Sequence, residues 1–186
     1  VNILICTHCF YDNPLAYGKN NFFLDFYDWL QFLAKISHST NYNWFIKPHP
    51  DYLPGTMEIL YSIGKNFKNL KFVNNKASFK QITQNLDVAL TVYGSVAHEL
   101  PLLGVKVINA SKDNPHKCYN FSVTPKNKTH YEKILKNLKK TKNYKVNKDE
   151  VFQFYFMHNN FFKTNLFQKF NEILKNNEDN TYKSAN

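Results

Sequence analysis

The sequence contains no arginine: all 24 of its basic residues are lysines, and against 14 acidic residues they give a net charge of +10. Proteins that read bases use arginine for two-pronged contacts with guanine, so this absence argues against sequence-specific nucleic-acid binding. The excess of lysine still favours anionic partners such as phosphates, nucleotides or an acidic membrane face. We therefore expect no nucleic-acid partner.

Long hydrophobic runs are also missing. No apolar stretch approaches the roughly 20 residues that a membrane-crossing helix needs. The N-terminus lacks the basic segment and apolar run of a secretory signal. Hydrophobic residues still make up 43% of the chain, which excludes wholesale disorder. These observations predict a folded cytoplasmic protein, and the first residue, Val1 rather than Met, leaves open that the chain is part of a longer one.

Cysteine is scarce: Cys6, Cys9 and Cys118 fit a reducing compartment better than a disulfide scaffold. Cys6 and Cys9 have C-x-x-C spacing, but a redox motif opens directly into a helix, and here the next helical pattern begins only near Asn20. A zinc site would need a second ligand pair, for which Cys118 with His116 is a loose candidate. We therefore expect structural cysteines, no metal and no cofactor.

Short apolar runs alternate with helical patterns along the chain, which is typical of repeated βα units and a parallel sheet. The expected strands cover residues 2–6, 43–47, 70–73, 87–92 and 105–109. The expected helices follow them at residues 22–33, 56–67, 78–85 and 95–103 and behind a capping-box pattern at 129–132. We predict an α/β fold with a Rossmann-like parallel sheet of about five to six strands flanked by helices. No linker is apparent, so we expect one domain over residues 1–176 and a polar tail at 177–186.

The C-terminal segment 148–174 is a long helical pattern, either continuous or broken near Asn159 and Asn160, and it is rich in phenylalanine. Two hypotheses explain the aromatic stripe. It either packs in a core or between domains, or it lies on a membrane surface. We favour packing, because tertiary burial explains most such stripes.

Polar residues gather where the expected strands end. Ligands of open α/β sheets bind beyond the carboxyl ends of the strands, where loops and helix N-termini converge. The residues at these ends are Thr7 and His8, then Lys47, His49 and Asp51, then Tyr93, Gly94 and Ser95, and finally Asn109, Ser111, Asn114 and His116. We predict a site for a phosphorylated ligand at this edge.

The Lys47-Pro48-His49-Pro50 motif is the sharpest of these signals. Its two prolines fix the backbone, so His49 is presented from a stiff turn and can donate a hydrogen bond to a phosphate oxygen. Lys47 would add a positive charge. Taken alone, the motif fits equally well a histidine that only shapes a turn.

Gly94 and Ser95 form the second element of the predicted site. Glycine lets a ligand approach the backbone, and Ser95 is positioned to cap a helix whose free N–H groups bind anions. Glu99, one turn later, is placed to accept hydrogen bonds from ribose hydroxyls. The alternatives are an ordinary cap for Ser95 and a solvated side chain for Glu99.

These motifs occur in an order that resembles the nucleotide-binding half of GT-B-type glycosyltransferases. The matching segments are residues 46–51, 87–99 and 104–108, and the resemblance is to the capsule and surface-polysaccharide group that includes Kdo transferases. It implies that His49 and Ser95 contact the donor phosphate and that Glu99 binds the nucleotide or its ribose. From their positions at the strand ends we expect Lys47 and Gly94 to join the phosphate contacts and Tyr93 the nucleotide contacts. The residues expected at the pocket edge or on the sugar are Thr7, His8, Asn109, Ser111, Asn114 and His116.

The same resemblance implies a nucleotide-sugar donor, a glycan or lipid-linked acceptor, and no essential metal. If the aromatic stripe of residues 148–174 lies on a membrane, the protein would associate peripherally with the inner face of that membrane. Such enzymes have a second, N-terminal domain that binds the acceptor and usually supplies the catalytic base. This chain has no room for that domain, so no catalytic residue is assigned. Many relatives also carry a Ser-Ser or Thr-Ser pair where this chain has Gly94 and Ser95.

Two other functions remain as hypotheses. A nucleotide-sugar epimerase would share the fold but would need active-site carboxylates from both domains. A non-catalytic module would bind polyanions through its lysines, with strong salt dependence and indifference to nucleotides.

Overall fold

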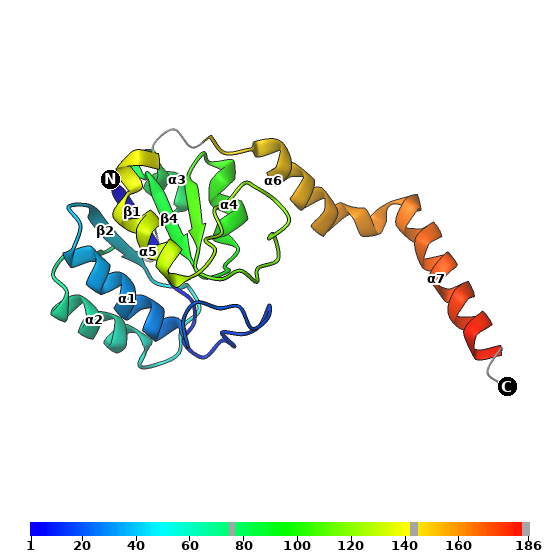
Figure 1. The fold of residues 1–186 in the computed structure, drawn as a ribbon, viewed down its shortest axis with the longest axis horizontal. Coiled ribbons are helices and arrows are strands. Elements are labelled where there is room, and N and C mark those ends of the chain that lie inside the picture. Colours follow the sequence, from blue (N-terminus) through cyan, green and yellow to red (C-terminus); the bar gives the residue numbers. More distant parts are fainter. Residues whose placement is uncertain (75–76, 142–144, 184–186) are drawn as a thin grey trace. The chain divides into compact units, whose positions relative to one another are not determined.

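The structure is a computed structural model that describes residues 1–74, 77–141 and 145–183. The chain divides into two compact units, residues 1–148 and 149–186, and each is described by itself. The first unit contains a parallel sheet in which the described strands have the order β3-β2-β1-β4-β5 (Figure 1). The strands are β1 (Asn2–Cys6), β2 (Asn43–Lys47), β3 (Leu70–Phe72), β4 (Val88–Thr91) and β5 (Lys106–Asn109). The predicted α/β class and parallel sheet are confirmed.

Helices cover both faces of this sheet. They are α1 (Phe26–His38), α2 (Thr56–Asn66), α3 (Phe79–Ile82), α4 (Val96–Leu102) and α5 (Lys128–Lys136). One hydrophobic cluster joins the sheet to α1, α2 and α5, and a second joins it to α4, with α3 packed against it. Side chains alternate along the central strand: Ile3 and Ile5 belong to the first cluster, and Leu4 and Cys6 to the second. Burial on both faces explains why the strands are nearly continuous hydrophobic runs.

Two helix starts differ from the predictions. The first helix begins at Phe26 rather than near Phe22, because the Asp25 carboxylate caps it by accepting a hydrogen bond from the Asp28 amide at 2.7 Å. The capping box predicted at residues 129–132 is wrong. Helix α5 is capped two residues earlier by Asn127, whose side chain accepts a hydrogen bond from the His130 amide at 2.8 Å.

The second unit is helical. Helix α6 (Lys148–Tyr155) leads into a π-helical turn at Phe156–Asn160 and a 3-10 turn at Phe161–Lys163, and α7 (Asn165–Lys183) follows. Of the two alternatives for this segment, the one with a break near Asn159 and Asn160 is the one observed. Phe152 and Phe170 are 60% and 53% exposed. Within the described residues, no helix combines the length and the apolar character that crossing a membrane requires. The single domain over residues 1–176, with a polar tail at 177–186, stays a prediction.

Candidate functional site

A cavity of about 260 Å³ lies at the carboxyl edge of the sheet, between the loops that follow β1, β2 and β4. Strand β2 pairs with one side of β1, and β4 pairs with the other side. The loops that follow β1 and β4 therefore run in opposite directions at this point of the sheet. Such a switch point is where open α/β sheets bind their ligands. The lining residues are Cys6, Thr7, His8, Lys47, Pro48, His49, Pro50, Phe79, Thr91, Gly94, Ser95, Val96 and Glu99.

Thr7 holds the His-Pro turn in place on one side of this cavity. Its hydroxyl accepts a hydrogen bond from the His49 amide at 2.9 Å and lies 3.4 Å from the Lys47 carbonyl oxygen, to which it donates. The Thr7 amide donates to the same carbonyl at 3.2 Å. The turn is thus tied to the end of β1 by one side chain, and the two prolines stiffen the backbone on either side of His49.

The surroundings of His49 occupy one nitrogen of its ring. The Asp51 amide nitrogen lies 3.1 Å from Nδ1 and the Asp51 carbonyl oxygen lies 2.9 Å from it, so Nδ1 has a partner on Asp51 in either tautomer. The Cys9 sulfur also lies 3.1 Å from Nδ1. Nε2 is therefore the ring nitrogen that His49 can offer to a ligand.

Lys47 brings a positive charge to the cavity although its side chain is buried. Its Nζ lies 5.3 Å from the centre of the Phe79 ring, which is within the range of a cation–π contact. Glu99 is the acidic residue among the described lining residues. The cavity lining thus contains one lysine and one carboxylate, and His49 adds an imidazole.

The two cysteines of the C-x-x-C spacing, Cys6 and Cys9, are buried and free. Burial raises the pKa of the Cys6 thiol to about 12, and burial also raises the pKa of the Cys9 thiol. Reactive thiols have lowered pKa values, so a redox role is disfavoured. Among the described residues there is no cluster of three or more potential metal ligands.

Gly94 closes the opposite side of the cavity, and only glycine fits there. A Cβ at this position would lie 2.8 Å from Thr91 Oγ1 and 3.4 Å from His8 Cε1. The Gly94 amide instead donates to Thr91 Oγ1 at 3.1 Å. The glycine is therefore needed for close packing of the turn. From the sequence alone, we interpreted it as leaving room for a ligand.

His8 joins the ends of β1 and β4. The Val92 amide donates to its Nε2 at 3.2 Å, Thr91 Oγ1 lies 3.0 Å away, and the ring stacks on Phe26 at 4.5 Å. Burial, together with the nearby His49, lowers the pKa of His8 to about 3, so the ring is neutral near pH 7. His8 is therefore a neutral lining residue that links the ends of β1 and β4.

Helix α4 begins directly after Ser95, at the rim of the cavity. Ser95 occupies the capping position, but the prediction that its side chain caps the helix is wrong, because it makes no capping hydrogen bond. Its side chain is exposed. The amides of Ser95 and Val96 donate no hydrogen bond to the described residues. Glu99, half-buried, lies in the first turn of the helix.

Tyr93 lies outside the cavity lining although it was predicted to contact the nucleotide. Its ring is buried and its hydroxyl donates to the Asn13 carbonyl at 2.7 Å. Its ring centre is 4.8 Å from that of His8. Tyr93 thus supports His8 from below the cavity and anchors the loop after β1.

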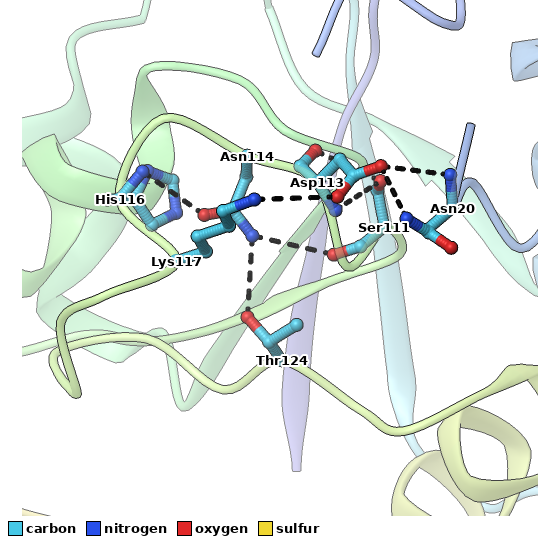
Figure 2. A network of polar contacts seen from close by, with 7 residues as sticks. All are labelled: Asn20, Ser111, Asp113, Asn114, His116, Lys117 and Thr124. Atoms are coloured by element: carbon cyan, nitrogen blue, oxygen red, sulfur yellow. Dashed lines mark hydrogen bonds and ion pairs between the residues drawn. The ribbon is translucent and has the colours of Figure 1, made fainter. Parts of the chain in front are cut away.

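The polar residues that follow β5 are also outside the cavity lining and bind one another (Figure 2). The Asn109 side chain donates to Ser122 Oγ at 2.9 Å. Asn114 accepts from the His116 amide at 3.2 Å, and Ser111 accepts from the Asp113 amide at 3.1 Å. Asp113 in turn accepts from the Asn20 amide and side chain at 3.0 and 2.8 Å. This network, here called the β5-loop clamp, comprises Asn20, Asn109, Ser111, Asp113, Asn114, His116, Lys117, Ser122 and Thr124.

Three residues of the cavity, Phe79, Thr91 and Val96, were not singled out from the sequence. A signal existed for Phe79: Ser78 and Gln81 form a capping box that starts α3 and places Phe79 at its first position. Thr91 is the last residue of a strand whose pattern indicates only a structural role, so nothing in its neighbourhood marked it.

No protein-family model matches the sequence, and the search of curated proteins likewise found no match.

Proposed function

We propose that this chain is the donor-binding half of a glycosyltransferase that uses a nucleotide-activated sugar, in the assembly of a surface polysaccharide. The observation that carries the proposal is the cavity at the β1–β4 switch point, which joins the His-Pro turn to the Gly94-Ser95 turn and Glu99. These two motifs are 45 positions apart in the sequence and line one cavity. Their combination supports a nucleotide site better than either motif alone.

The donor phosphate would bind between His49 and the start of α4. His49 offers its Nε2, and the amides of Ser95 and Val96 face no protein acceptor among the described residues. Lys47 adds positive charge from the floor of the cavity. Donors arranged in advance around a phosphate stabilise the charge that develops on it as it leaves.

Glu99 would bind the ribose of the donor. It lies one turn along α4 from Ser95 on the cavity lining, so its carboxylate can accept hydrogen bonds from sugar hydroxyls. A carboxylate this close to a phosphate would repel it. Separate positions for the phosphate at the helix start and the ribose one turn later avoid this cost.

In the proposed reaction, the bond between the sugar carbon and the donor phosphate oxygen breaks and its electrons leave with the nucleotide. The acceptor hydroxyl forms the new bond to the same carbon and gives its proton to a base. We propose that a second domain supplies the acceptor site and this base. His49, Lys47 and the amides at the start of α4 stabilise the negative charge on the leaving nucleotide phosphate.

Calorimetric titration with CMP, CDP, UDP and GDP tests the proposal. At least one nucleotide should bind, and His49→Ala should weaken its binding by about 10- to 150-fold, since a hydrogen bond to a charged group contributes about 1.5–3 kcal/mol. His130→Ala is the matched control. His130 is likewise half-buried and accepts a backbone amide at Nδ1, from Lys126 at 3.0 Å, but it is not part of the cavity.

Two outcomes would contradict the donor site. One is that none of the four nucleotides binds. The other is that His49→Ala binds as tightly as the unmodified protein. Binding of polyanions that falls steeply with salt, with indifference to nucleotides, would favour the non-catalytic module instead.

A further inference from the structure

A second cavity, of about 400 Å³, lies between α2 and the carboxyl ends of β2 and β3. Pro48 forms part of the wall of both cavities, so the two are neighbours. The described residues that line the second cavity include Tyr52, Met57, Tyr61, Phe72 and Asn74, and none of the described lining residues is charged. In a protein with 24 lysines this lining is unusual, and it does not suit a phosphate.

Aromatic side chains dominate this cavity and are open to solvent. Tyr61 is 57% exposed and Tyr52 is 39% exposed. Tyr61 meets Phe72 edge to face, with ring centres 5.2 Å apart and an interplanar angle of 61°. Neither tyrosine hydroxyl bonds to any described residue. The cavity therefore presents open aromatic surface together with hydroxyl groups that are available to a ligand.

Gly64 in α2 makes room for this arrangement. A Cβ on Gly64 would lie 2.6 Å from Phe72 Cε2, so the ring rests directly on the helix backbone. Glycine in a helix interior costs about 0.5–1 kcal/mol relative to alanine. That cost is offset here by the seating of Phe72, which in turn supports Tyr61. The aromatic lining is thus held by a particular backbone contact.

We propose that this second cavity binds a neutral sugar ring of an oligosaccharide. The absence of charge among its described lining residues selects a neutral ligand. An edge-to-face pair leaves single aromatic faces instead of a parallel slot, and a single face suits the C–H face of a pyranose. Tyrosine combines an apolar body with a polar tip, so its hydroxyl can bond to the sugar hydroxyls at the ring edge.

The shared wall at Pro48 gives this site a place in the proposed reaction. A glycan held on Tyr52 and Tyr61 would lie next to the nucleotide cavity, on the far side of the His-Pro turn. The identification of that glycan as the growing acceptor rests on the proposed function. The binding of a neutral sugar ring does not, because the residues that carry it are separate from His49, Ser95 and Glu99.

Ligand-observed NMR tests the site. Saturation-transfer spectra would be recorded with a panel of neutral di- and trisaccharides of glucose, galactose and N-acetylhexosamines, with cytidine and uridine in parallel. We expect transfer to at least one saccharide and about 2- to 13-fold weaker binding in Tyr61→Ala, since aromatic contacts of this kind are worth about 0.5–1.5 kcal/mol. Tyr52→Ala, a loop position, provides a second variant if Tyr61→Ala unfolds.

Tyr27→Ala is the matched control, because Tyr27 is a 46%-exposed helical tyrosine that lies outside this cavity. It should leave saccharide binding unchanged, and so should His49→Ala. The proposal is overturned if no saccharide shows transfer, if saccharide affinity is unchanged in both Tyr61→Ala and Tyr52→Ala, or if only the nucleosides bind. A failure of the nucleotide titrations with intact saccharide binding would remove the donor site and leave this one.

Discussion

The cavity and the β5-loop clamp differ in what their polar groups do. Both lie in loops after strands of the same sheet, and both were predicted as parts of one site. In the clamp the polar side chains bond to one another, as Asp113 does to Asn20 at 2.8 Å (Figure 2). In the cavity, the His49 ring is held at Nδ1, and its Nε2 and the Glu99 carboxylate remain available to a ligand. A polar residue at a strand end is therefore a candidate for binding only if the fold has not already used it.

Each of the two regions contains one buried histidine. We expect low pH to destabilise the two regions to different extents. Burial lowers the pKa of His8 to about 3 and that of His116 to about 4, from an ordinary value of 6.5. The unfolded chain binds the proton more readily than the folded one. Stability is therefore fully present above pH 6.5 and falls as the pH drops toward these values. We expect a loss on the order of a few kcal/mol from His8, measured by urea unfolding across this range.

The variants His8→Gln and His116→Gln sharpen this comparison. Glutamine at position 8 keeps an acceptor for the Val92 amide but does not take up the proton, so the acid-induced loss should shrink. His116→Gln should remove a smaller part of the loss, because its pKa is lowered less. Identical pH profiles for both variants and the unmodified protein would show that neither histidine is held neutral.

Gly94→Ala should disturb the cavity and leave the β5-loop clamp intact. The added methyl group would press on Thr91 Oγ1 at 2.8 Å, and overpacking of this kind costs about 1–3 kcal/mol. It would also displace the Gly94-Ser95 turn, so nucleotide binding should be lost. Ser95→Ala is the control in the same turn. It should leave the free energy of unfolding unchanged, because the Ser95 side chain makes no capping hydrogen bond.

The sequence predicted the layers of this fold because alternating strand and helix patterns report burial directly. Residues 87–92 read as a buried strand, and β4 is buried throughout. It also placed His49 and the Gly94-Ser95 turn in one site, because parallel strands end at one edge. The sequence could not show that Asn109 is bonded within the fold whereas Glu99 is available to a ligand, since both are polar residues near a strand end. The difference is that Asn109 bonds to Ser122, 13 positions away, through a loop closure that local patterns do not encode.

Asp113→Asn should weaken the clamp and leave the cavity intact. The Asn20 amide and side chain donate to the Asp113 carboxylate and lower its pKa. Stability from this carboxylate is present above the ordinary aspartate pKa of about 3.9 and is lost as the pH falls through the lower folded value. The variant should therefore be less stable near neutrality, and the difference should shrink in acid. Altered nucleotide affinity in this variant would break the separation between the two regions.

Cys9→Ala should have the smallest effect, and it tests how firmly the His-Pro turn is held. Cys9 donates its one thiol hydrogen to the Asp51 carbonyl next to His49, so its removal takes away one hydrogen bond that holds this turn while Thr7 still binds it. A hydrogen bond of this kind contributes about 1 kcal/mol, so nucleotide affinity should fall about fivefold. Cys9→Ser should restore most of it, because the hydroxyl can donate in place of the thiol. A loss in Cys9→Ala that serine does not restore would point to packing, since the alanine removes volume from a buried position.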